Sequence, residues 1–105
     1  MYKGITPTFT LTLSDETLDL GTATSVYVTF ADRDGKVLLT KTGADLVRDE
    51  NVVEVYLTQA ETLSFPQKVS IQVNWTYNDG GTVKRDCSEI AITYFRNNLL
   101  NEVIV

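Results

Sequence analysis

Apolar and polar residues alternate with a period of two in several short stretches of this chain. The longest stretch, residues 68–77, reads KVSIQVNWTY and alternates five apolar residues with small polar ones. Strict alternation of this kind predicts a β-strand that buries one face. Asn78-Asp79-Gly80-Gly81 follows, and glycine accepts the positive φ that tight hairpin turns need. We therefore expect a long hairpin whose return arm is residues 82–94.

The return arm of this hairpin has an irregular pattern. Its first apolar residues fall on one parity, whereas Ile90, Ile92 and Tyr94 fall on the other. Because the side-chain period of a strand is two, parity changes only where an extra residue is inserted. The pattern therefore predicts a β-bulge between about Asp86 and Glu89.

The same strand-type pattern recurs in the first half of the chain. The stretches are residues 8–13, 25–31, 36–41 and 52–58, with a short edge piece at Leu46-Val47. One helix-like signal follows them, a capping box in which Thr58 and Glu61 satisfy backbone donors reciprocally. We expect a short helical turn near residues 59–63 that crosses between two sheets, with Leu63 and Phe65 closing one end of the core.

Short strands with turn signals about every ten residues predict the fold class. Together with a buried Trp75, they indicate an all-β, antiparallel immunoglobulin-like β-sandwich of six to seven strands. A small β-barrel of SH3-like or OB type is the alternative. A length of 105 residues fits one domain. We expect the β-sandwich domain to occupy residues 1–95 with Trp75 at the centre of its core, and residues 96–105 to form an apolar C-terminal tail.

The charge balance bears on the class of partner. The chain has 14 acidic and 9 basic residues and a net charge of −5. Nucleic-acid backbones and anionic membrane surfaces attract clustered Lys and Arg, so we expect neither nucleic acid nor membrane as a partner. No apolar run is long enough for a signal peptide or a membrane span, so we expect the chain in a reducing cytoplasm until it is carried elsewhere.

Candidate catalytic and metal-binding residues are few. The sequence contains no histidine, which removes the usual Ser and Cys triads and most zinc sites. The single cysteine, Cys87, lies among carboxylates that disfavour the thiolate a nucleophile needs. Asp32 and Asp34 resemble the start of a calcium loop, but Lys41 stands where the bidentate glutamate should be. We expect no enzymatic activity, no metal and no cofactor.

Two sets of residues are candidate interaction surfaces. In an immunoglobulin-like sandwich we expect strands 25–31 and 52–58 to be neighbours in one sheet, which places Tyr27 and Tyr56 together on its outer face. An ordinary sheet surface stabilised by cross-strand Tyr–Thr pairs is the alternative. The tail, which is too apolar for a free terminus, either folds back over the sandwich or docks on a neighbouring subunit. Its apolar residues are Leu99, Leu100, Val103, Ile104 and Val105.

Several pieces of the sequence carry a resemblance to a known family. They are Gly4–Phe9, Val26–Phe30, Asp34-Gly35-Lys36, Leu57–Thr62, the closing hairpin, and the tail motif Leu100-Asn101-Glu102. The layout resembles small proteins encoded in prophage structural regions of Gram-positive bacteria, and the N-terminal β-sandwich domain of the phage baseplate upper protein family. Baseplate upper proteins continue into further domains, whereas this sequence stops after one.

The resemblance implies a function and a location. It implies a non-enzymatic structural or assembly component of a phage or prophage virion, in an accessory role in the tail or baseplate. The implied partners are other phage structural proteins or further copies of the chain. The implied location is the cytoplasm of the bacterial host and then the virion. A stand-alone immunoglobulin-like binding module for a carbohydrate or a surface protein is the alternative function.

Overall fold

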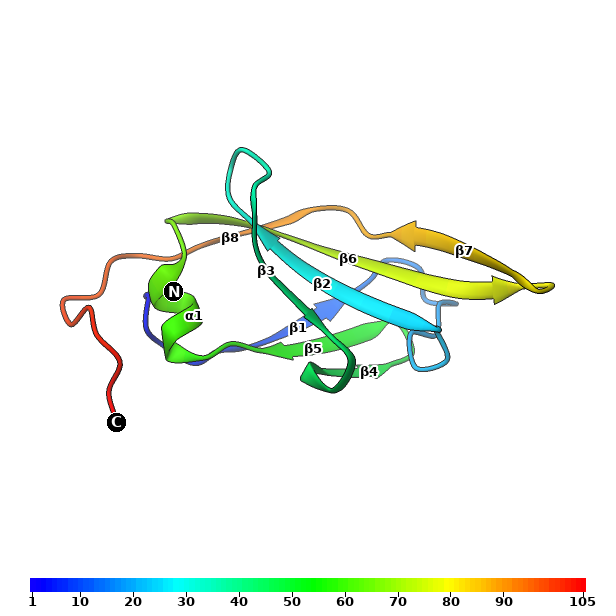
Figure 1. Cartoon of the computed structure of the whole chain (residues 1–105), viewed down its shortest axis with the longest axis horizontal. Helices are drawn as coiled ribbons and strands as arrows, with labels where there is room; N and C mark the ends of the chain where they lie inside the picture. The colour runs from blue at the N-terminus through cyan, green and yellow to red at the C-terminus, as the bar shows by residue number, and fades with distance from the viewer.

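The computed structural model describes residues 1–105 and consists of two antiparallel sheets packed into a sandwich (Figure 1). The three-stranded sheet has the order β1 (Thr8–Thr12), β5 (Val52–Tyr56), β4 (Leu46–Asp49). The five-stranded sheet has the order β3 (Val37–Thr42), β2 (Ser25–Ala31), β6 (Lys68–Asp79), with β7 (Thr82–Cys87) and β8 (Ala91–Tyr94) along the far side of β6. A 3₁₀ turn, η1 (Gly43–Asp45), and one helix, α1 (Gln59–Ser64), complete the elements. The expected all-β sandwich and its short helix are confirmed.

The strand order matches an immunoglobulin-like sandwich with strands B–E–D in one sheet and C′–C–F–G in the other. β1 takes the place of strand B beside β5, and β2 and β3 take the places of C and C′. β7 and β8 form two halves of strand G, so the sandwich has seven strand positions. β1 pairs only with β5, so the sheets do not close into the alternative small barrel.

The expectation that strands 25–31 and 52–58 are neighbours is wrong. β2 pairs with β3 and β6, whereas β5 pairs with β1 and β4 in the other sheet. The expectation takes the first strand of the chain as the first strand of an immunoglobulin domain. β1 instead occupies the position of the second strand, B. Residues 25–31 therefore occupy the position of strand C rather than strand B, and strand C belongs to the other sheet.

The long hairpin is confirmed and projects beyond the sandwich (Figure 1). Its last ladder pair is Asp79–Thr82, which leaves a two-residue turn of Gly80 and Gly81 with φ of 60° and 89°. Positive φ at both positions is the pattern of a type I′ turn, whose twist matches that of the flanking strands. The projecting arm contributes to a long molecular axis of 53 Å.

The return arm carries the expected β-bulge. Between Cys87 and Ala91 it has three residues, 88–90, whereas the facing part of β6 has two, Gln72 and Val73. The extra residue shifts the register by one. The apolar side chains of the return arm nevertheless remain largely exposed, because the bulge turns those of β8 to the outer face of the sheet.

Ser88 holds the bulge in place. Its backbone N–H donates to the carbonyl oxygen of Val73 at 2.8 Å, and its Oγ accepts from the Val73 N–H at 3.0 Å. The Gln72 side-chain amide also donates to the Ser88 carbonyl at 2.9 Å. One side chain therefore replaces the backbone partner that the bulge removes from β6.

Four phenylalanines form an aromatic cluster in the core. Their ring centroids lie 5.5–6.5 Å apart in stacked, tilted and edge-to-face contacts, which are the arrangements that aromatic pairs prefer. The members are Phe9, Phe30, Phe65 and Phe95. Trp75 is buried in the same core, with 7% of its surface exposed, but it is not part of this cluster and also lies at the base of a surface groove. The expected burial of Trp75 in the core is confirmed, whereas its place at the centre of the core stays a prediction.

Helix α1 connects the two sheets and closes one end of the core. The capping box is present: the Thr58 Oγ accepts from the Glu61 N–H at 3.2 Å, and the Glu61 carboxylate accepts from the Thr58 N–H at 2.8 Å. Phe65, at the end of the helix, is 2% exposed, and Leu63 is half-buried. The crossover role expected for this segment is confirmed.

Candidate interaction site

The two candidate tyrosines lie on opposite faces of the molecule. Tyr27 is on the outer face of the five-stranded sheet and Tyr56 on that of the three-stranded sheet, and they are 42% and 51% exposed. Since the outer faces of a sandwich point in opposite directions, the expected Tyr27–Tyr56 patch does not form. Tyr56 stands opposite Thr8 across the β1–β5 ladder, which is an ordinary cross-strand pair.

Tyr27 borders a shallow polar hollow of about 370 Å³ on the five-stranded sheet. The other residues around it are mainly hydroxyl, amide and guanidinium groups: Thr29, Thr40, Asn74, Thr76 and Arg85, with the edge of Trp75. The Arg85 guanidinium is fixed, because its Nε and Nη2 donate to the Asn74 Oδ1 at 3.3 and 3.0 Å. This hollow is suited to a small polar ligand that stacks on a tyrosine.

The tail is held to its own chain by hydrogen bonds between side-chain amides and backbone groups. The Gln59 side-chain amide donates to the Ile104 carbonyl at 2.9 Å and accepts from the Ile104 N–H at 2.8 Å. Asn98 donates to the Lys3 carbonyl at 3.0 Å. Residues 97–105 form no helix or strand. The tail therefore lies beside α1, at the end opposite the projecting hairpin (Figure 1).

The apolar side chains of the tail stay in contact with solvent. Leu99 and Val105 are fully exposed, and the other three range from 46% to 63% exposed. Folding back beside α1 covers about half of Leu100 and Val103 and less of Ile104, so much of the apolar surface of the tail stays in contact with water. Docking of these side chains on a neighbouring subunit stays a prediction.

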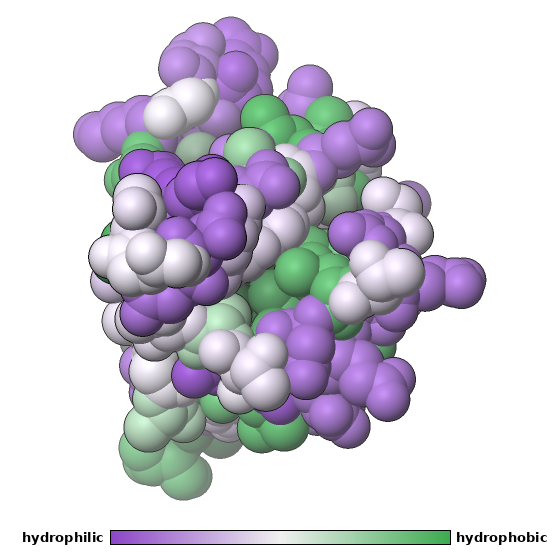
Figure 2. Space-filling model, turned by 90° about the vertical axis from the view of Figure 1, so that its right-hand side faces the viewer, coloured by the Kyte–Doolittle hydropathy of each residue, from purple (hydrophilic) through white to green (hydrophobic).

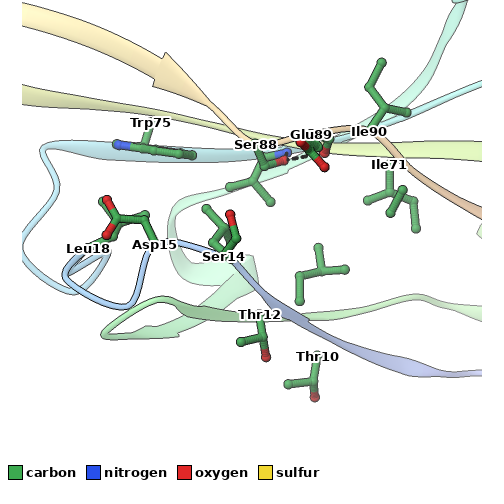
Figure 3. Close-up of a pocket in the computed structure, with 14 residues that line it drawn as sticks. Thr10, Thr12, Ser14, Asp15, Leu18, Ile71, Trp75, Ser88, Glu89 and Ile90 are labelled. Atoms are coloured by element: carbon green, nitrogen blue, oxygen red, sulfur yellow. Dashed lines mark hydrogen bonds between the residues drawn. The ribbon is translucent and has the colours of Figure 1, made fainter.

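A groove of about 360 Å³ runs between β1 and the bulged return arm (Figure 3). Three inward side chains of β6 (Ile71, Val73 and Trp75) lie at its base. Leu18 and Asp15, from the loop after β1, lie near Trp75 at one end of the groove (Figure 3). The wall on the return-arm side is formed by residues 88–91. An apolar base between two strands is the part of this surface best suited to hold another segment of chain.

The β1 side of the groove is an unpaired strand edge. The Pro7 carbonyl accepts from the Leu57 N–H and the Leu13 N–H donates to the Asn51 carbonyl, so the odd-numbered residues of β1 direct their backbone groups toward β5. Backbone groups of successive strand residues point to opposite sides. Those of Thr10, and of the other even-numbered threonines, therefore point to the open edge.

The β8 side is also unpaired over most of its length. The Phe95 N–H donates to the carbonyl of Gln67, the residue before β6, so Ile92 and Tyr94 direct their backbone groups away from β6. The amino group of Met1 donates to the Tyr94 carbonyl at 3.3 Å. No strand pairs with the edge at Ile92. The free edge of β1 thus lines the groove, and the free edge of β8 continues from Ala91, the one residue of β8 in the groove wall.

The end of the sandwich from which the hairpin projects carries both apolar and polar side chains. Figure 2 views this end and shows an apolar area near its middle, bordered by polar side chains. Asp15 contributes to the polar border of the groove. The Thr17 hydroxyl and then the Thr17 N–H donate to its carboxylate and lower the pKa of Asp15. The groove therefore keeps a fixed negative charge at one end near neutral pH.

The residue types that bind metals are dispersed over the structure. No three carboxylate, cysteine or histidine side chains come together as metal ligands do. Cys87 is exposed on the outer side of β7 and forms no disulfide.

Lys41 and Glu61 form the less exposed of the two salt bridges, with their Nζ and Oε2 atoms 3.0 Å apart. Partial burial acts to raise the pKa of Glu61, but hydrogen bonds from Thr58 and the charge of Lys41 outweigh it and the pKa is lowered.

None of the helices has the length and apolar character needed to cross a bilayer.

Comparisons with protein-family models, with curated proteins and with solved structures found no match.

The groove is the feature that sequence reasoning missed. The bulge that shapes one wall was expected from the parity of the return arm. The strand that faces this wall depends on which sheet β1 joins, and an alternating Thr strand is equally compatible with either sheet. The sequence signal that could have indicated the groove is the lack of charged residues in Thr8–Thr12. Free edge strands usually carry charges that prevent pairing, so an uncharged edge strand remains able to pair with an added strand.

Proposed function

We propose that this chain is a non-enzymatic assembly component of a phage or prophage virion, with an accessory role in the tail or baseplate. Its partners in this proposal are other phage structural proteins or further copies of the chain. It is made in the cytoplasm of the bacterial host and ends in the virion. The observation that carries the proposal is the tail, in which five apolar side chains stay exposed.

The energetics of the tail favour an assembly role. Burying a Val, Leu or Ile side chain stabilises a protein by about 1.5–3 kcal/mol relative to leaving it exposed. Five such side chains within seven residues, Leu99–Val105, are a substantial unused driving force. Contiguous exposed apolar surface of this kind marks protein–protein contact sites. A partner surface that covers the tail would release that free energy.

The resemblance to prophage structural proteins supplies the biological setting. Its pieces fall on structural elements of the sandwich: Gly4–Phe9 leads into β1, Val26–Phe30 lies in β2, and Leu57–Thr62 contains the cap of α1. These pieces belong to the framework of the domain. They support the proposed class of protein, whereas the tail supports the proposed mode of action.

The experiment measures whether the chain is present in the phage particle and whether its incorporation depends on the tail. Purified particles from the host that carries the gene are analysed by mass spectrometry, with wild type, Val103→Asp and Asn97→Asp chains. We expect wild type and Asn97→Asp in the particles and at least a tenfold loss of Val103→Asp, because only the latter puts a charge where an apolar contact is made. Asn97→Asp adds the same charge at an exposed position outside Leu99–Val105. Absence of the wild-type chain from the particles would contradict the proposed function.

A binding module for a carbohydrate is the second candidate function, and the polar hollow beside Tyr27 favours it. An aromatic ring next to hydroxyls and a fixed arginine can contact both the faces and the hydroxyls of a sugar. This candidate predicts hits in a glycan screen that Tyr27→Ala abolishes and Tyr56→Ala leaves intact. Tyr56 is the matched control because it is similarly exposed on the opposite sheet. A screen without hits for the wild type would reject this candidate.

A further inference from the structure

We infer that the groove between β1 and β8 is the acceptor for the C-terminal tail of a second copy of this chain, with residues Leu99–Val105 adding as an extended strand. The inference rests on the proposed assembly function and names the partner surface. It describes strand addition, a mode in which an extended segment pairs with a free sheet edge and its side chains fill pockets beside it. The occupant is argued from the edges of the groove, from its base and from the path of the tail.

Strands β1 and β8 differ from the other edge strands in having no charged residue. Free edge strands usually carry charged residues that prevent pairing with another chain. Here β3 contains Lys41, β4 contains Arg48 and Asp49, and β7 contains Lys84 and Arg85. In contrast, β1 (TFTLT) and β8 (AITY) contain no charged residue. These two strands therefore lack that protection, and the charged residues that line the groove, Asp15 and Glu89, lie outside them.

The base of the groove suits an apolar strand. Ile71, Val73 and Trp75 are only 2–7% exposed and line the groove, so an inserted segment would meet an apolar floor that is already packed. In the figure, the Thr10 and Thr12 side chains point away from the groove, which leaves the β1 backbone accessible along it (Figure 3). A segment that fits must therefore offer backbone groups at its sides and apolar side chains toward the floor.

The tail has this composition. In an extended conformation Leu99, Val103 and Val105 share one face, because side chains alternate along a strand. Val103-Ile104-Val105 are β-branched residues, which favour strands. Glu102 is the single charged side chain between Leu99 and Val105. Residues 97–105 form neither helix nor strand, and the contact of the tail with α1 is the pair of hydrogen bonds between Gln59 and Ile104, which an added strand would have to replace.

The groove cannot receive the tail of its own copy. The tail leaves β8 at Arg96, and there the edge is occupied by the N-terminal residues: the Arg96 N–H donates to the Met1 carbonyl and the Lys3 N–H donates to the Arg96 carbonyl. To enter its own groove the tail would have to turn back along this occupied edge. It instead lies beside α1, at the other end of the molecule from the projecting hairpin (Figure 1). The donor is therefore a second copy.

A tail-to-groove contact is heterologous, since two different surfaces meet. Such contacts form rings where the rotation between copies closes and open chains where it does not. The mass in solution should consequently rise with concentration and pass beyond that of a dimer, unless a closed ring is reached first.

The experiment measures mass by multi-angle light scattering for the full chain across a hundredfold range of concentration. Ala91→Asp places a charge in the groove wall, and Ala44→Asp makes the same change at an exposed alanine in η1, which does not line the groove. We expect the wild type and Ala44→Asp to associate alike, and Ala91→Asp to need at least tenfold higher concentration for the same mass. Thr10→Pro is the second groove variant, because proline removes only the outward N–H of an edge strand. Urea unfolding of each variant shows that it is folded.

The outcomes separate this inference from the proposed function. A wild type that stays at the mass of one chain at every concentration overturns the inference. So does association that Ala91→Asp and Thr10→Pro leave unchanged while Val103→Asp removes it, because the tail would then dock elsewhere. In either case the chain can still be found in particles, and the proposed function stands. Its absence from particles removes the proposed function whether or not the purified chain associates.

Discussion

Thr62 is a polar residue with no exposed surface in a molecule whose buried residues are otherwise apolar. Its Oγ1 accepts from the Gly4 N–H at 2.9 Å and donates to the Ile5 carbonyl at 2.8 Å. This hydroxyl therefore joins α1 to the segment that leads into β1. Gly4 has a φ of +85°, so the turn at this point also depends on glycine. One side chain thus fixes where the first strand begins.

Thr62→Val tests this role at the residue scale. Valine keeps the shape but leaves the Gly4 N–H and the Ile5 carbonyl without their partner, and we expect a loss of about 1–3 kcal/mol in the free energy of unfolding. Thr62→Ser keeps the hydroxyl and should lose less. Urea unfolding at pH 7 measures all three proteins. A valine variant as stable as the wild type would show that the two backbone groups find other partners.

For Tyr27 and Tyr56, the sequence pattern predicts that the side chains are exposed but not where they lie in the fold. The exposure of Tyr27 and Tyr56 follows from their parity within alternating strands and was expected correctly. The location of the two tyrosines on different sheets was not expected. The alternation of a strand shows which of its residues face the core, but it does not show to which sheet the strand belongs. The same limit applies to Trp75: its burial followed from the pattern, whereas its absence from the phenylalanine cluster depends on packing between the sheets.

Among the secondary-structure elements, short local sequence patterns were sufficient to predict the helix, the hairpin turn and the bulge. The capping box placed α1 within a residue of its observed start, and the glycine pair located the hairpin turn. The change of parity located the bulge, although the seryl side chain that replaces a backbone partner there could not be foreseen. Each of these features is determined by residues close together in the sequence, which is why the sequence predicts them.

Helix α1 provides a test that depends on pH. The ion pair with Lys41 and the cap bond to Thr58 hold the pKa of Glu61 below its ordinary value of 4.5. A carboxylate with a lowered folded pKa stabilises the fold above its unfolded pKa, and this contribution is lost as pH falls through the lowered value. Glutamine keeps the capping box but carries no charge. Glu61→Gln should therefore cost up to about 1 kcal/mol at pH 7 and reduce the loss of stability on acidification below pH 4.5.

Urea unfolding of wild type and Glu61→Gln as a function of pH measures this difference. Glu16→Gln, at an exposed position without hydrogen-bond partners, controls for the change in net charge. Parallel pH profiles for Glu61→Gln and wild type would show that the Lys41 pair contributes nothing to folding.

At the scale of the whole molecule, the decisive property is the position of β1. As strand B of the sandwich it lies at the edge of the three-stranded sheet, opposite β8 across the groove. Had it paired in the other sheet, the groove would not exist. No local pattern distinguishes the two topologies, because they differ only in contacts between residues distant in the sequence. The fold class was therefore predictable from the sequence, but the groove was not.

In the proposed assembly the tail of one copy enters the groove of another. Cross-linking between two single-cysteine chains tests this contact, both with Cys87→Ser so that the exposed native thiol is absent. An isotope-labelled copy carries Ala91→Cys in the groove, an unlabelled copy carries Val103→Cys in the tail, and a short thiol–thiol cross-linker is added to the mixture. We expect cross-linked pairs of one labelled and one unlabelled chain, at least tenfold more abundant than with Ala44→Cys in place of Ala91→Cys. Equal yields at the two positions, or none at either, would contradict the proposed contact.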